Sequence, residues 1–214
     1  MVMVVSLGGS FMFAYPDKVL ELKRILNKFK EKFIIVCGGG RLAREYIAFG
    51  KKLGLKQVTL HEAGIKSTQL NAWIIAKKFG GTFSDGDPRE IKPSAKIMVM
   101  GGYKPGWTTD TCSAYAAISS KSKIIFNLSK ENKIYNKDPS KSRDARPIDK
   151  MNFNRLYELT IGKKVPGMNF IFDPLAGKLC KRNGIDVVVT NDVTDILRYI
   201  MRLPIKGTLI TETR

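Results

Sequence analysis

Glycine-rich turns follow three short apolar runs of the sequence, and turns of this kind can bind phosphate. They read LGGS, CGGGRLAR and MGGYKPGWTTD, at residues 7–10, 37–44 and 100–110. Glycine lets backbone N–H groups approach an anion closely and permits positive φ. A helix that begins directly after the turn adds the positive end of its dipole. One such turn is more often a tight connection, but three at one edge of a sheet predict a site for several phosphates in a row.

Polar side chains near two of these turns could act on the same phosphates. Arg44 lies one helical turn beyond the GGG cluster, so its guanidinium can reach back to a phosphate. The alternative is a surface arginine on a helix that also carries Lys51 and Lys52. The Thr108-Thr109-Asp110 sequence begins another helix, where these residues serve as caps or, with their hydroxyls, as ligands of a phosphate or ribose.

The elements that position these turns alternate between strands and helices. We expect strands at Val2–Leu7, Phe33–Cys37, Lys96–Met100, Ile124–Leu128, Asp186–Thr190 and, at an edge, Thr208–Thr211. We expect helices at Asp17–Lys30 with Asp17 as N-cap, Arg41–Leu53, Ser67–Phe79, Thr109–Ser119, Asp173–Arg182 and Asp192–Met201. Residues 129–148 are predicted to form a loop and hairpin. The alternation predicts an α/β fold with a mostly parallel sheet covered on both faces. We expect one domain over residues 1–214, with lobes at about 1–120 and about 121–214.

Composition excludes several classes of protein. With 214 residues, 43% hydrophobic and 26% charged, the chain is globular in type and not disordered. No apolar run is long enough to span a membrane, and the first residues resemble a buried strand more than a signal peptide. Three scattered cysteines and one histidine argue against a disulfide framework and a Cys/His zinc site. We therefore expect a cytoplasmic protein, and no residue is a candidate metal ligand from the sequence.

The net charge of +18 favours anionic ligands. Residues 121–182 hold 15 Lys and Arg against 6 Asp and Glu. The sequence has no run of five consecutive basic residues, and aromatic residues are not interleaved with basic ones, so nucleic acid is not the expected main partner. The GxxxxGK[ST] loop, a GxGxxG after the first strand and the HRD and DFG elements are all missing from the sequence. Phosphate binding would therefore depend on glycine turns together with Lys and Arg.

In family order along the chain, six segments resemble the amino acid kinase superfamily and, within it, the UMP kinases of archaea and bacteria. They are VVSLGGS, IIVCGGGRLAREYI, GIKSTQLNA, GGYKPGWTTD, IYNKDP and FDPLAGKL with the terminal KGTLI. The resemblance implies a three-layer α/β/α fold that assembles as a homohexamer. It also implies transfer of the ATP γ-phosphoryl group to UMP with Mg²⁺, giving UDP in pyrimidine nucleotide biosynthesis.

The resemblance also implies roles for individual residues. Residues expected to bind UMP are Gly39, His61, Tyr103, Lys104, Pro105, Gly106, Trp107, Thr108 and Thr109. Residues expected to bind ATP are Gly8, Gly9, Ser10, Gly40, Arg44, Ser129, Lys130, Tyr135 and Asp138. The candidates for stabilising charge during transfer are Arg44, Lys104 and Lys130.

Four positions depart from the family pattern. Ser6 stands where many superfamily members carry a lysine on the first strand. His61 occupies the position of an acidic residue that binds ribose, with Glu62 beside it as a substitute. Gln69 replaces an arginine, leaving Asn71.

The fourth departure is the segment Ser129–Lys133, which replaces a T-[NK]-V-D-G turn. Lys133 at a position suited to glycine would strain a turn with positive φ, so we expect this loop to take another shape. Three alternatives to a UMP kinase stay open. One is a superfamily kinase with a carboxylate, carbamate or isoprenoid phosphate acceptor, although Thr108 and Thr109 favour a nucleotide. The others are a nucleotide-binding sensor or storage protein without turnover, and a nucleic-acid-binding protein.

Overall fold

A computed structural model describes residues 1–137, 142–161 and 172–212, and within them a central sheet organises the fold. Its strands follow the order β3-β4-β2-β1-β5-β9-β10-β8. They are β1 (Val2–Leu7), β2 (Lys32–Cys37), β3 (Thr82–Ser84), β4 (Ile97–Met100), β5 (Ile124–Leu128), β8 (Lys150–Met151), β9 (Asp186–Thr190) and β10 (Thr208–Ile210). A separate antiparallel pair joins β6 (Ile134–Tyr135) to β7 (Pro147–Ile148), which confirms the expected hairpin.

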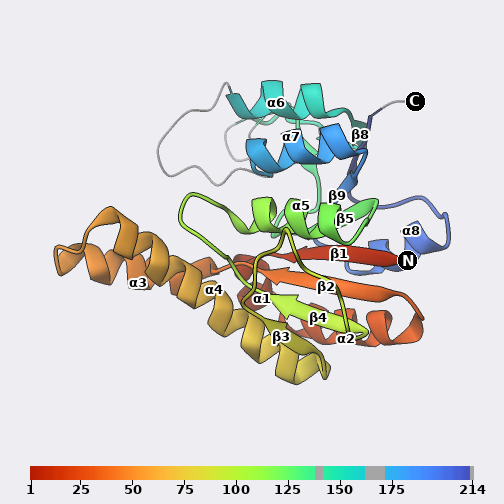
Figure 1. Ribbon diagram of the computed structural model, residues 1–214. Coiled ribbons are helices and arrows are strands. Elements are labelled where there is room, and N and C mark those ends of the chain that lie inside the picture. Colours follow the sequence, from red (N-terminus) through yellow and green to blue (C-terminus); the bar gives the residue numbers. More distant parts are fainter. Residues whose placement is uncertain (138–141, 162–171, 213–214) are drawn as a thin grey trace.

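Helices cover both faces of the sheet (Figure 1). They are α1 (Gly9–Ala14), α2 (Pro16–Lys28), α3 (Gly40–Lys52), α4 (Gln57–Phe79), α5 (Thr109–Ser119), α6 (Phe153–Ile161), α7 (Pro174–Asn183) and α8 (Thr194–Ile200). Alternate residues of β1 point to opposite faces. Val5 joins a buried cluster with α1, α2, α4 and α8, whereas Val4 joins another with α5, α6 and α7. The predicted three-layer α/β/α fold is confirmed.

The central strands are parallel, as predicted. β1 pairs in parallel with β2 and β5, β2 with β4, and β5 with β9. The prediction of a final edge strand is wrong, because β10 lies between two neighbours. Leu209 is in register with Val188 of β9 on one side, in antiparallel pairing, and with Lys150 of β8 on the other.

Most predicted helix boundaries shift by one or two residues, and three of the helix starts have a clear physical reason. α4 begins at Gln57, ten residues before the expected start, because its first part packs mainly on α3 and carries little apolar periodicity. Asp17 is not an N-cap: α2 begins at Pro16, whose fixed φ suits the first turn. α8 begins at Thr194, whose backbone N–H donates to the Asp192 carboxylate at 2.9 Å. The helices α1 and α6 were not predicted.

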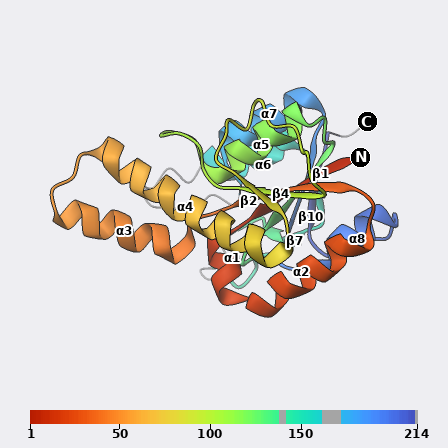
Figure 2. The ribbon, with the colours of Figure 1, turned by 60° about the horizontal axis from the view of Figure 1, so that its bottom comes forward.

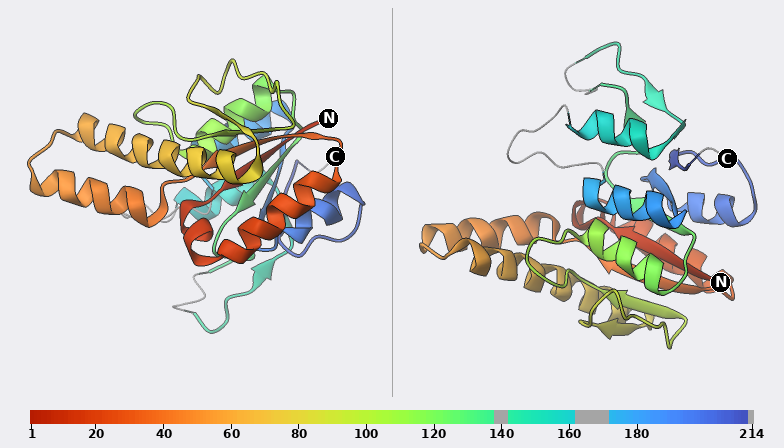
Figure 3. Two further views of the ribbon diagram at one scale, coloured as in Figure 1. Left: turned by 90° about the horizontal axis from the view of Figure 1, so that it is seen from below. Right: turned by 45° about the horizontal axis from the view of Figure 1, so that its top comes forward.

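A helical hairpin projects from the layered body. Figures 2 and 3 show α3 and the first part of α4 lying antiparallel and extending beyond the sheet, while the second part of α4 lies over it. Close packing joins the two helices at Gly50, where a Cβ atom would lie 2.8 Å from a Leu60 methyl group. α3 therefore begins at the sheet and ends away from it, so its first turn is the part near the glycine turns.

Candidate functional site

The three glycine turns meet at one edge of the sheet, because they follow the carboxyl ends of the parallel neighbours β1, β2 and β4. The first two are packed backbone against backbone. A Cβ atom on Gly9 would lie 2.2 Å from the Gly40 nitrogen, and one on Gly38 would lie 2.8 Å from the Gly9 nitrogen. Gly40 also has a φ of 60°, which favours glycine. Glycine is therefore required here for the turns to approach each other.

Side chains of α4 fasten the second and third turns. The Asn71 amide donates to the Gly38 carbonyl oxygen at 2.8 Å. The Thr68 hydroxyl oxygen accepts the Gly102 N–H at 2.6 Å, and the Gln69 amide donates to the Gly102 carbonyl oxygen at 3.2 Å. From the sequence, we named Asn71 as part of this helix but gave no role to Thr68. One helix thus fixes the distance between two turns.

A larger cavity of about 550 Å³ opens at the first two turns. It brings together seven of the nine residues predicted to bind ATP, namely Gly8, Gly9, Ser10, Gly40, Arg44, Ser129 and Lys130. Ser6, Asp110 and Asn127 also border it. The helices α1, α3 and α5 each begin within or beside its wall, and the first N–H groups of a helix lack intrahelical partners. The arrangement suits a polyanion.

A smaller cavity of about 250 Å³ adjoins the first and shares Gly39, Gly40 and Thr109 with it. It brings together seven of the nine residues predicted to bind UMP, namely Gly39, His61, Lys104, Pro105, Trp107, Thr108 and Thr109. His61 lines this cavity, and its Nε2 lies 3.1 Å from the Gln57 amide nitrogen. Two ligands bound in these cavities would meet at the shared wall.

Three of the predicted residues line neither cavity, and a fourth is not described. Tyr103 packs beside Trp107, with ring centres 6.2 Å apart. Gly106 is in the turn itself, with a φ of 85°. Tyr135 belongs to β6, which pairs with β7. Asp138 lies outside the described residues.

Stacked side chains hold Lys104 at the smaller cavity. Its ammonium group lies 4.2 Å from the centre of the Trp107 ring. Trp107 also stacks on Tyr115, with ring centres 4.4 Å apart. The Arg89 guanidinium lies 5.4 Å from the centre of the same Trp107 ring. The turn after β4 therefore presents a cation whose position is set by aromatic packing.

Asp110 is a carboxylate at the larger cavity whose importance the sequence did not reveal. Its Oδ1 accepts the Ser6 hydroxyl at 2.9 Å, and its Oδ2 accepts the backbone N–H of Asp173 at 3.3 Å. Burial raises the pKa of Asp110 to about 6, against the lowering effect of the Ser6 hydrogen bond. Near neutral pH this carboxyl can therefore change its charge beside a site for phosphates.

The loop at Ser129–Lys133 takes another shape, as expected. Among the described residues, only Lys121 and Arg202 combine a positive φ with a side chain, so Lys133 is free of that strain. The Ser129 N–H donates to the Thr190 carbonyl oxygen at 3.0 Å, and the Lys133 ammonium pairs with Asp149. A hydrogen bond to the end of β9 and an ion pair with Asp149 thus hold the two ends of this loop.

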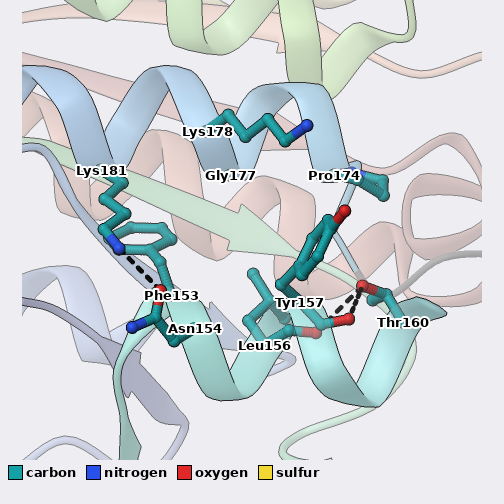
Figure 4. A pocket seen from close by; sticks show the side chains of 9 residues that line it. All are labelled: Phe153, Asn154, Leu156, Tyr157, Thr160, Pro174, Gly177, Lys178 and Lys181. Atoms are coloured by element: carbon teal, nitrogen blue, oxygen red, sulfur yellow. Dashed lines mark hydrogen bonds between the residues drawn. The ribbon is translucent and has the colours of Figure 1, made fainter. Parts of the chain in front are cut away.

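A further pocket of about 290 Å³ lies between α6 and α7 (Figure 4). Its ammonium groups are engaged locally: Lys181 donates to the Asn154 side-chain oxygen at 2.6 Å, and Lys178 lies 5.5 Å from the centre of the Tyr157 ring. It shares no lining residue with the two cavities at the glycine turns. The predicted phosphate-binding residues therefore define a different site.

No group of three or more His, Cys, Asp or Glu residues among the described residues is placed to hold a metal ion. None of their helices is long and apolar enough to cross a membrane.

Known proteins resemble this chain over most of its length. The model of the family described as "Amino acid kinase family" matches residues 1–191. The uridylate kinase of Methanocaldococcus jannaschii is 33% identical, over 97% of this chain and 98% of that protein. The uridylate kinase of Thermoplasma volcanium is 33% identical, over 92% of each. The crystal structure of uridylate kinase from Archaeoglobus fulgidus superposes with a TM-score of 0.82 at 27% identity, covering 99% of this chain and 100% of that one.

Proposed function

This chain belongs to the amino acid kinase family, and on that premise we propose that it is a UMP kinase. It transfers the γ-phosphoryl group of ATP to UMP and forms UDP, a step of pyrimidine nucleotide biosynthesis. Uridylate kinases that match nearly the whole chain support this assignment. The observation that carries it is the pair of adjoining cavities at the glycine turns.

The shared wall between the cavities suits phosphoryl transfer. The reaction needs the acceptor oxygen in line with the γ-phosphorus, and it needs neutralisation of charge more than a covalent intermediate. We assign ATP to the larger cavity and UMP to the smaller, so that their phosphates meet near Gly39, Gly40 and Thr109. Backbone N–H groups of the turns then bind phosphate oxygens without reorganisation.

Basic side chains divide between the two nucleotides. Arg44 and Lys130 border the larger cavity and act on the ATP phosphates, while Lys104 borders the smaller cavity and acts on the phosphate of UMP. His61 contacts the UMP ribose. Ser129 and Lys130, with Tyr135 and Asp138 of the following segment, form the site for the ATP base and ribose.

The residues at the larger cavity fit Mg²⁺ that arrives with ATP. Magnesium prefers oxygen ligands, keeps several waters and is commonly bound through nucleotide phosphates with one or two carboxylates. Asp110 and Glu131 border this cavity. When bound, Mg²⁺ neutralises charge on the phosphate oxygens.

We also propose two lobes, at about 1–120 and about 121–214, and assembly into a homohexamer. The wall of the larger cavity takes residues from both proposed lobes, and α5 packs on α7 across them. Support for self-association comes from exposed apolar side chains on α3, on α4 and on the loop between them. They are Tyr46, Phe49, Leu53, Leu55, Val58, Leu70, Trp73 and Ile74, eight of the fifteen large exposed apolar side chains found in the described residues. A second copy of the chain would cover them.

The test is a phosphoryl-transfer assay with purified protein, ATP, Mg²⁺ and a panel of acceptors. The panel holds UMP, CMP, AMP and GMP together with carboxylate, carbamate and isoprenoid phosphate acceptors. UDP formation from UMP, well above product from every other acceptor, is the expected result. Product from a different acceptor would reassign the enzyme, and nucleotide binding without product would indicate a sensor or storage protein. Salt-dependent affinity for long RNA that exceeds the affinity for mononucleotides would indicate nucleic-acid binding.

A further inference from the structure

The carboxylate of Asp173 connects the beginnings of two helices. Its Oδ1 accepts the N–H groups of Leu175 at 2.6 Å and Ala176 at 3.2 Å, which caps α7. Its Oδ2 accepts the Thr108 hydroxyl at 2.8 Å. Thr108 is the N-cap of α5 and is 65 residues away in the sequence. One side chain thus joins α7 to the turn that follows β4.

The Thr108 hydroxyl has little freedom in this arrangement. Its oxygen accepts the N–H of Thr111 at 3.1 Å, and its single proton is donated to the Asp173 carboxylate at 2.8 Å, which is nearer than the Thr111 hydroxyl oxygen at 3.3 Å. Thr108 therefore offers the smaller cavity no hydroxyl donor while Asp173 holds it. Thr109 also lines both cavities, and none of the described residues accepts its hydroxyl proton. Of the two threonines, Thr109 is the one able to donate to a ligand.

The turn needs such a connection because much of it is exposed. Pro105, Gly106 and Thr108 are exposed to solvent, and Gly106 has a positive φ. α7 is a firm support for it, because Ala176 and Cys180 are buried in the same apolar cluster as Cys112 and Ala116 of α5. Figure 1 shows α5 and α7 side by side. A bond from α7 therefore fixes the end of the turn to the body of the protein.

We propose that Asp173 is a positioning residue for the acceptor nucleotide. It holds Thr108, and through Thr108 the turn at residues 101–109, in the conformation that binds UMP and leaves the Thr109 hydroxyl directed to the ligand. The proposal rests on the proposed function, because it takes UMP to occupy the smaller cavity. The backbone N–H of Asp173 also donates to Asp110, and a change of side chain leaves that N–H in place.

The variant Asp173→Ser removes the hydrogen bond to Thr108 but keeps the cap of α7. Serine caps a helix about as well as aspartate, but its hydroxyl is one bond too short to reach Thr108 as well. We expect the KM for UMP to rise about tenfold, since a hydrogen bond to a charged group is lost from the turn. The KM for ATP and kcat should stay within about twofold, and Tm within about 3 °C, because the cap and the Asp110 contact remain.

Three further variants make the result specific. Asp173→Asn keeps the cap and can donate its amide N–H to Thr108, so most of the affinity for UMP should return. Asp173→Ala loses both cap and connection, and should lower Tm as well as UMP affinity. Asp17→Ser removes an exposed carboxylate from the first turn of α2 and controls for the loss of one negative charge.

Two results would overturn the proposal. One is a KM for UMP in Asp173→Ser equal to that of the wild type. The other is a parallel loss of UMP affinity, ATP affinity and Tm in the serine and alanine variants, which would make Asp173 a structural cap only. Calorimetric titration with UMP separates this proposal from the proposed function. If the wild type forms no UDP but binds UMP, weaker binding by Asp173→Ser still supports the positioning role, and a wild type that does not bind UMP contradicts both.

Discussion

Replacement of Asp110 by asparagine should increase the free energy of unfolding at neutral pH. This gain should grow as the pH rises. Asp110 is one of the residues that line the larger cavity, and burial raises its pKa from 3.8 to about 6. Ionising it in the folded state therefore costs free energy that the unfolded chain does not incur. Asparagine carries no charge, and its amide can still accept the Asp173 N–H while donating to Ser6.

The size and sign of the effect follow from the two pKa values. A raised pKa means that the folded state holds the proton more tightly, so the contribution of Asp110 to stability is complete below pH 3.8 and is lost as pH rises through about 6. At 1.36 kcal/mol for each pKa unit, the full loss is about 3 kcal/mol. About half of this loss of stability, ~1.4 kcal/mol, occurs between about pH 5 and 7.5. Because Asp110 also borders an open cavity, water reaches it and these figures are upper values.

Urea unfolding of both proteins across this pH range measures the effect. The free energy of unfolding of Asp110→Asn minus that of the wild type should increase by ~1 kcal/mol from about pH 5 to 7.5, since contributions of all other groups cancel in the difference. Ser122→Ala, at a buried position without a carboxyl group, is the control and should show a difference independent of pH. A pH-independent difference for Asp110→Asn would refute the raised pKa and its cause.

Three other changes test the site and the assembly. Gly9→Ala should abolish ATP binding and lower stability, because its methyl group would lie 2.2 Å from the Gly40 nitrogen; calorimetry and thermal unfolding measure both. Arg44→Ala should lower kcat at least about tenfold at unchanged Tm, whereas Arg41→Ala, an exposed arginine on the same helix, should leave kcat unchanged. Phe49→Lys should reduce the molar mass measured by light scattering, because a charge enters the proposed contact between copies.

Strands in the centre of the sheet could be predicted from the sequence. β1, β5 and β9 match their predicted bounds, because strands covered on both faces form continuous apolar runs. The two-residue strand β8 carries no such signal, and its place is set by pairing with β10 across a long stretch of chain. That long-range pairing is also why the final strand could not be recognised as an interior one.

The candidate site shows the same division between local and long-range information. Glycine turns and the arginine that follows them are local patterns, and the structure brings them together as expected. Asp110 was explained by helix capping, which is sufficient in the local sequence, and Asp173 was predicted only as the first residue of a helix. Their further contacts, with Ser6 and Thr108, join residues 104 and 65 positions apart, and only the fold reveals them.

The central claim is that glycine turns at neighbouring strand ends hold the phosphates of two nucleotides side by side. A crystal structure with UMP and a non-hydrolysable ATP analogue tests it most directly. We expect the ATP phosphates against Gly8, Gly9 and Gly40, and the phosphate of UMP in the smaller cavity between Gly39 and Thr109. Either nucleotide bound elsewhere, for example between α6 and α7, or phosphates too far apart for in-line transfer, would contradict it.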